Sequence, residues 1–155
     1  MSTMSQRISL ALLALAALFI APATTMAEDA PGKIVQACLE RITQVTQTTV
    51  ENGRDHAAST VQAVANLDQA DAPAPVLIHR ANAGKATITA NAQRGKARLD
   101  LTTANCIAEL QDAGAPPAAF EALITANRAA SARITAAANR ARSVVNHALD
   151  TALNN

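Results

Sequence analysis

Two cysteines, Cys38 and Cys106, have the clearest chemical potential in this chain. Each falls where apolar residues recur every three or four positions, and a proline-marked break near Ala74 lies between them. If the chain folds back at Ala74, the two cysteines differ in level by about four residues, or roughly 6 Å of helix. Both also fall on the inward stripes of their segments. We therefore predict a Cys38–Cys106 disulfide, with two reduced, buried cysteines as the alternative.

A disulfide requires an oxidising compartment, and the first 27 residues indicate export. A positive charge at Arg7 precedes an apolar run from Ile8 to Ile20, and small residues follow up to Ala23 and Ala27. This order is typical of a cleavable signal peptide, and the apolar run is short for a membrane span. We predict a secreted or periplasmic protein, with cleavage after either alanine left open.

Nine basic residues form two blocks, and neither block contains an acidic residue. They are Arg80, Lys85, Arg94, Lys96 and Arg98 in the first block, and Arg128, Arg133, Arg140 and Arg142 in the second. Side by side on two helices, the blocks would give a cationic flank for an anionic polymer or lipid headgroups. Acidic residues of the preceding segment, such as Glu51 and Asp55, fall at the same levels and would neutralise part of it.

The remaining residues give weaker signals for chemistry. His79, His147 and Asp150 fall near one end of the expected fold and could bind a divalent ion, although their spacing matches no known motif. Exposed histidines near helix ends are the simpler interpretation. The chain has no Cys-x-x-Cys pair, phosphate loop or Ser-His-Asp arrangement. We therefore predict no cofactor, no metal site and no enzymatic activity.

Composition limits the partners further. Loss of Arg7 with the leader lowers the basic count from 13 to 12, which equals the 12 acidic residues. The chain has no Trp or Tyr, and Phe120 is the one aromatic residue beyond the leader. A neutral chain without stacking platforms is not expected to bind nucleic acid sequence-specifically.

Helical periodicity runs through three segments, at about residues 30–71, 76–113 and 117–153. Prolines mark the two breaks between them, and such short connections favour antiparallel neighbours. The prediction is an all-α fold: an antiparallel three-helix bundle of long Ala-rich helices with coiled-coil-like packing, forming one domain over residues 28–155. Asn52–Gly53 is a weak point at which the first helix would break, if it breaks at all.

The third segment has a thin apolar stripe. Between Thr125 and Ser143 its one large aliphatic residue is Ile134, and the inward stripe as assigned includes Asn127 and Val144. Such a helix either completes a stable bundle or docks loosely and finds a partner. We therefore predict a binding or interaction module for a protein partner or for self-association. The alternatives are the anionic ligands described above, and a small-ligand or metal-binding bundle.

Overall fold

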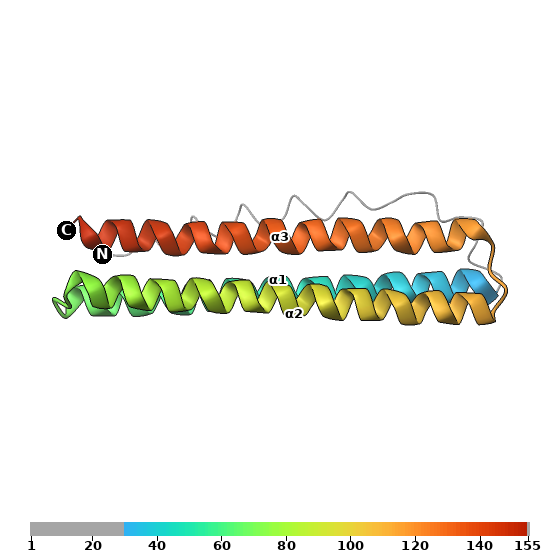
Figure 1. The fold of residues 1–155 in the computed structure, drawn as a ribbon, viewed down its shortest axis with the longest axis horizontal. Helices are drawn as coiled ribbons and strands as arrows, with labels where there is room; N and C mark the ends of the chain where they lie inside the picture. Colours follow the sequence, from blue (N-terminus) through green and yellow to red (C-terminus); the bar gives the residue numbers. More distant parts are fainter. Residues whose placement is uncertain (1–29, 155) are drawn as a thin grey trace, which may run out of the picture.

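The computed structural model describes residues 30–154, which form three long helices packed against one another. They are α1 (Ala30–Gln69), α2 (Ala74–Asp112) and α3 (Pro117–Leu153). The helices lie side by side along their whole length (Figure 1). The all-α class is therefore confirmed. The predicted signal peptide lies outside the described residues.

Both turns between helices use the same local structure. Ala72 N–H donates to the Leu67 carbonyl at 3.0 Å, and Ala115 N–H donates to the Leu110 carbonyl at 3.0 Å. These are the long hydrogen bonds of a Schellman motif, which needs a left-handed residue just before the donor. Asp71 and Gly114 fill that position, with φ values of 53° and 64°. Because a proline follows two residues later in each case, each helix stops and the next begins at once.

Buried side chains recur every 11 residues on all three helices. On α2 they are Leu77, Ile88, Leu99 and Leu110, on α3 Leu123, Ile134 and Val145, and on α1 Cys38, Thr49 and Thr60. Eleven residues in three turns give 3.67 residues per turn, close to the 3.6 of a straight helix. The helices accordingly show little curvature (Figure 1).

The apolar core consists of two clusters along the bundle axis. One contains Cys38, Cys106 and Leu123, and the other contains Ile88 and Val145. Both clusters also include alanines, such as Ala81 and Ala130, and an alanine contributes little buried area. The long thin core explains why close helix contacts matter for this fold.

The structure decides two details that were expected from the sequence, the inward residue near the end of α3 and the continuity of α1 at Gly53. The assignment of Val144 to the inward stripe is wrong. Val144 is 53% exposed, whereas the neighbouring Val145 is fully buried. The 11-residue step from Ile134 reaches Val145, so the step of three chosen after Ala141 rotated the stripe by one residue. Gly53 is buried within an uninterrupted α1, so the helix does not break there.

Candidate functional site

The α1/α2 seam is closed by its cysteines. Cys38 and Cys106 are both 0% exposed, and their Cα atoms lie 5.9 Å apart with the sulfurs at disulfide distance. The predicted proximity of the two cysteines is therefore confirmed. Arg41 Nη1 donates to Glu109 Oε1 at 2.6 Å across the same seam. The end of the α1/α2 pair farthest from its turn is thus crossed by both contacts.

Two glycines of α2 bring its backbone close to α1. A Cβ atom at Gly95 would overlap the Thr49 side chain, and one at Gly84 would overlap Thr60. The Thr49 hydroxyl donates to the Val45 carbonyl within its own helix, at 2.7 Å, so its burial leaves no polar atom unsatisfied. Each threonine side chain fits into the notch left by a glycine, and this is possible only without a side chain there.

The contacts also define how the two helices are aligned. Cys38 faces Cys106, Thr49 faces Gly95 and Thr60 faces Gly84, so numbers rise along one helix as they fall along the other. Successive pairs are 11 residues apart on both helices. Asn91 of α2 adds a hydrogen bond from Nδ2 to the Thr49 carbonyl, at 2.8 Å. The seam therefore has one well-defined register.

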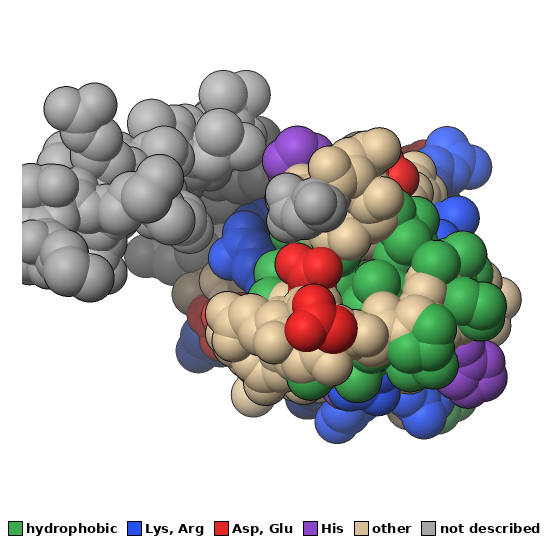
Figure 2. All heavy atoms as spheres, turned by 90° about the vertical axis from the view of Figure 1, so that its left-hand side faces the viewer, with side chains coloured by type: hydrophobic (Ala, Val, Ile, Leu, Met, Phe, Trp, Pro, Cys, Tyr) green, Lys and Arg blue, Asp and Glu red, His purple; other side chains and the backbone are tan. Residues whose placement is uncertain are grey.

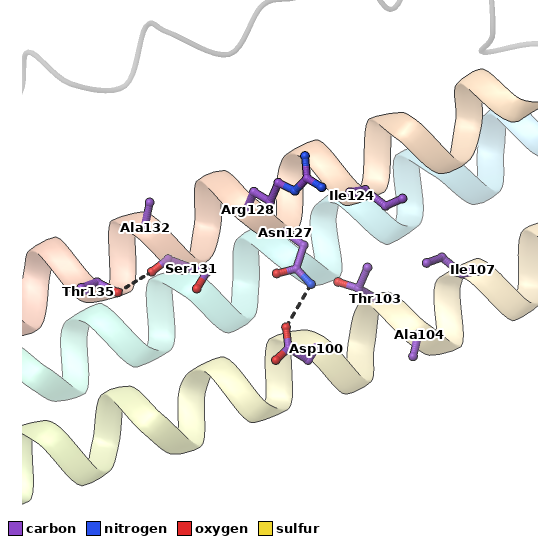
Figure 3. Close-up of a pocket in the computed structure, with 10 residues that line it drawn as sticks. All are labelled: Asp100, Thr103, Ala104, Ile107, Ile124, Asn127, Arg128, Ser131, Ala132 and Thr135. Atoms are coloured by element: carbon purple, nitrogen blue, oxygen red, sulfur yellow. Dashed lines mark hydrogen bonds between the residues drawn. The ribbon is translucent and has the colours of Figure 1, made fainter.

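The α2/α3 side differs, because an open groove of about 690 Å³ lies along it (Figure 3). From α2 it is lined by Asp100, Thr103, Ala104 and Ile107, and from α3 by Ile124, Asn127, Arg128, Ser131, Ala132 and Thr135. Most of the exposed lining is apolar, with polar groups distributed along its length. The groove combines an apolar surface with hydrogen-bonding groups, as binding sites do.

The contacts across this groove are exposed and polar. Asn127 Nδ2 donates to Asp100 Oδ1 at 3.1 Å, and the two side chains point toward one another (Figure 3). Farther along, Lys85 Nζ donates to Asn146 Oδ1 at 2.9 Å. Exposed bonds of this kind exchange readily with water, and each contributes little to the folded state.

Sequence reasoning singled out Asn127 but missed Asp100, Ser131 and Thr135. Asn127, Ser131 and Thr135 are spaced by four residues, which puts them on one edge of α3. That polar stripe beside the buried stripe was the available signal. No sequence pattern pointed to Asp100, because its hydrogen-bond partner Asn127 lies on another helix.

The nine basic residues do not share one face. On α2, Lys85 and Lys96 are 11 residues apart and fall on the edge that meets α3, where Lys85 reaches Asn146. Arg80, Arg94 and Arg98 fall on the other side of the buried stripe. In the end view, basic side chains of the bundle as a whole appear on several sides (Figure 2).

The second block divides in the same way. Arg128 lines the groove, and Arg142 precedes Asn146 by one turn on the same edge of α3. Arg133 and Arg140 fall on the opposite edge. None of the nine forms an ion pair within 4.0 Å with another described residue. The α2/α3 side therefore carries Lys85, Lys96, Arg128 and Arg142; anion binding by this set stays a prediction.

Within residues 30–154, no three His, Cys, Asp or Glu side chains are grouped so that they could hold a metal ion. At the end where α1 turns into α2, apolar side chains gather on one side of the bundle (Figure 2). Val76, Ile78 and Leu153 are exposed large apolar residues near this end of their helices.

Known proteins give no further guide to function. No family model, no curated protein and no solved structure matches the chain. Among the described helices, none combines the length and apolarity that a membrane crossing needs.

Proposed function

We propose that this protein is an exported, non-catalytic helical bundle that binds a protein partner along its α2/α3 side. One observation carries the proposal: the α1/α2 seam is closed by notched side chains and a cysteine pair, whereas the α2/α3 side is an open, mainly apolar groove. A surface of this kind costs free energy when it stays exposed to water, and a partner that covers it recovers that cost.

The proposal includes the removal of the leader, the oxidation of the cysteine pair and the manner of helix packing. The leader is removed after Ala23 or Ala27, the Cys38–Cys106 pair is oxidised after export, and the helices pack as an antiparallel coiled-coil-like bundle with an 11-residue repeat. A native mass spectrum of the untagged exported protein tests the first two points. It gives the cleavage site, and alkylation after unfolding reports free thiols. Two alkylated cysteines or a retained leader would reject export as described here.

Photo-crosslinking tests the binding surface itself. A photoreactive amino acid is placed at Ala104 or Thr135, which line the groove, and the exported fraction is irradiated. The matched controls are the next residues, Asn105 and Ala136, which are exposed but point about 100° around their helices. We expect the same protein adduct from both groove positions and none from the controls. Adducts from the control positions, or none from the groove, would contradict the proposal.

A second candidate is favoured by four cations on the same side, none of which forms an ion pair within 4.0 Å with a residue in the described part of the chain. An anionic polymer or a layer of lipid headgroups could bind Lys85, Lys96, Arg128 and Arg142 through charge alone. Such binding would retain the protein on heparin resin at low salt and release it at moderate salt. No retention at low salt would end this candidate.

A further inference from the structure

The groove between α2 and α3 is long enough to hold a short helix. Its α3 wall extends from Ile124 to Thr135, which are 11 residues apart, or about 16 Å of helix. Its direction follows the bundle axis, because both walls are helices that lie side by side (Figure 3). An occupant that matches this shape is a rod of about three turns. The small residues Ala104 and Ala132 line the groove, and small side chains allow close packing of helices.

The charge along this side is mainly positive: four cations lie on it, with Asp100 and with Asp150, which is two 11-residue steps beyond Arg128 on the same edge of α3. Lys85, Lys96, Arg128 and Arg142 fall on it, and none forms an ion pair within 4.0 Å with a described residue. Asp100 is the acidic residue of the groove lining, and its carboxylate already accepts a hydrogen bond from Asn127. A complementary occupant therefore carries acidic residues at its edges and apolar residues toward Ile107 and Ile124.

We propose that the groove binds an acidic amphipathic helix, which packs along α2 and α3 as a fourth helix of the bundle. This inference rests on the proposed binding function and adds the chemistry of the partner. The apolar face of the partner covers Ile107 and Ile124, and its carboxylates reach Arg128 and Lys96 at the rim. Helix-in-groove recognition of this kind places apolar anchors at i, i+3, i+4 and i+7.

Other occupants fit less well. A simple polyanion would leave the apolar lining uncovered. A second copy bound symmetrically through the same side would bring two surfaces of the same net positive charge together, since such a contact is made by the same surface on both molecules. Like charges opposed in an interface are costly.

A peptide selection tests the inference without assuming a sequence. A displayed library of helix-forming peptides about 16 residues long, or roughly 24 Å as a helix and so longer than the groove, is selected against the oxidised mature protein. We expect enriched sequences to be acidic and to carry apolar residues with helical spacing. Enrichment of basic or uncharged peptides, or no enrichment at all, would overturn the inference.

Two charge-reversed variants locate the binding. Arg128→Glu lies on the groove, and Arg133→Glu is the matched control on the opposite edge of the same helix; both arginines are exposed. The selected peptide should bind Arg128→Glu at least about tenfold more weakly and Arg133→Glu as it binds the natural chain. Equal binding to both variants would overturn the assignment.

A scrambled peptide with the same composition separates helix recognition from binding by charge alone. If the scrambled peptide binds with equal affinity and heparin displaces both peptides, the α2/α3 side binds polyanions by charge alone. That result would overturn the inference. Photo-adducts at Ala104 and Thr135 with a partner that lacks an acidic helix would also reject it, while the proposed binding function would stand. Absence of those adducts rejects the binding function itself.

Discussion

The α1/α2 and α2/α3 seams belong to one bundle but are built on different principles. Along α1/α2, Thr49 and Thr60 fit into notches at Gly95 and Gly84, and the cysteine pair continues the same 11-residue spacing. Along α2/α3, a groove remains open and is bridged by exposed polar contacts. Close packing admits one register, whereas exposed polar bridges allow replacement by a partner. The first seam therefore holds the helices in register, and the second is the one on which the proposed binding depends.

The largest effect is expected from the cysteines. Changing Cys38→Ala or Cys106→Ala removes a cross-link over 68 residues, which in the chain-entropy model is worth about 4 kcal/mol of unfolding free energy. Denaturant unfolding with and without reductant measures it. Reductant should lower the stability of the natural protein and leave the variants unchanged. A melting temperature within a degree or two of the natural protein would show that this seam does not depend on the bridge.

The glycines give the next largest effect and carry their own control. Gly84→Ala and Gly95→Ala each place a Cβ against a threonine side chain and should destabilise the fold by about 2 kcal/mol. Gly53→Ala meets only Asn91 Nδ2 at an ordinary 3.6 Å, and should stabilise by about 0.5–1 kcal/mol through helix propensity. Thermal unfolding of the three variants measures both signs. The same sign at all three positions would refute the notched seam.

The two turns have different residues at the left-handed position, Asp71 in the first and Gly114 in the second. The effect of this difference on stability should be measurable. Asp71 adopts a left-handed conformation that glycine adopts without strain, so Asp71→Gly should stabilise the protein by up to about 1 kcal/mol. Gly114→Ala has open space around its Cβ and should destabilise by about 1 kcal/mol through the backbone alone. Thermal unfolding of each single variant would detect these shifts. A stabilised Gly114→Ala would contradict the Schellman geometry.

The smallest effect is expected in the groove. Asp100→Ala removes the bond from Asn127, which is exposed, and should change the unfolding free energy by less than about 0.5 kcal/mol. Asn91→Ala is the comparison in the closed seam, because it removes a part-buried bond to the Thr49 carbonyl and should cost about 1 kcal/mol. If Asp100→Ala costs more than Asn91→Ala in denaturant unfolding, the roles of the two seams are reversed.

Much of the fold could be predicted from the sequence. The prolines after Asp71 and Gly114 cannot continue a helix, and apolar spacing of three and four defines the helices between them. The meeting of Cys38 and Cys106 followed from their inward positions and from the place of the first turn. The 11-residue spacing of Leu77, Ile88, Leu99 and Leu110 on α2 was also available in the sequence. The same spacing on α3, from Leu123 and Ile134, leads to Val145 and not to Val144.

The groove could not be predicted, for a geometric reason. Whether Arg128 and Arg133 share a surface depends on the rotation of α3 about its axis, and an error of one residue turns a side chain by about 100°. The sequence contains both blocks of basic residues, but their division between sides depends on packing. Asp100 and Asn127 likewise become partners only when the levels of α2 and α3 are known.

Amide hydrogen exchange of the oxidised, unliganded protein tests the comparison most directly. Peptides from residues 38–60 and 84–106 report the closed seam, and peptides from residues 124–140 report α3 beside the groove. We predict that the α3 peptides exchange through a local opening of lower free energy, because within residues 30–154 no cross-link or glycine notch joins α3 to α1 or α2. A single exchange free energy for all three helices, or earlier opening of α1 from α2, would contradict the account.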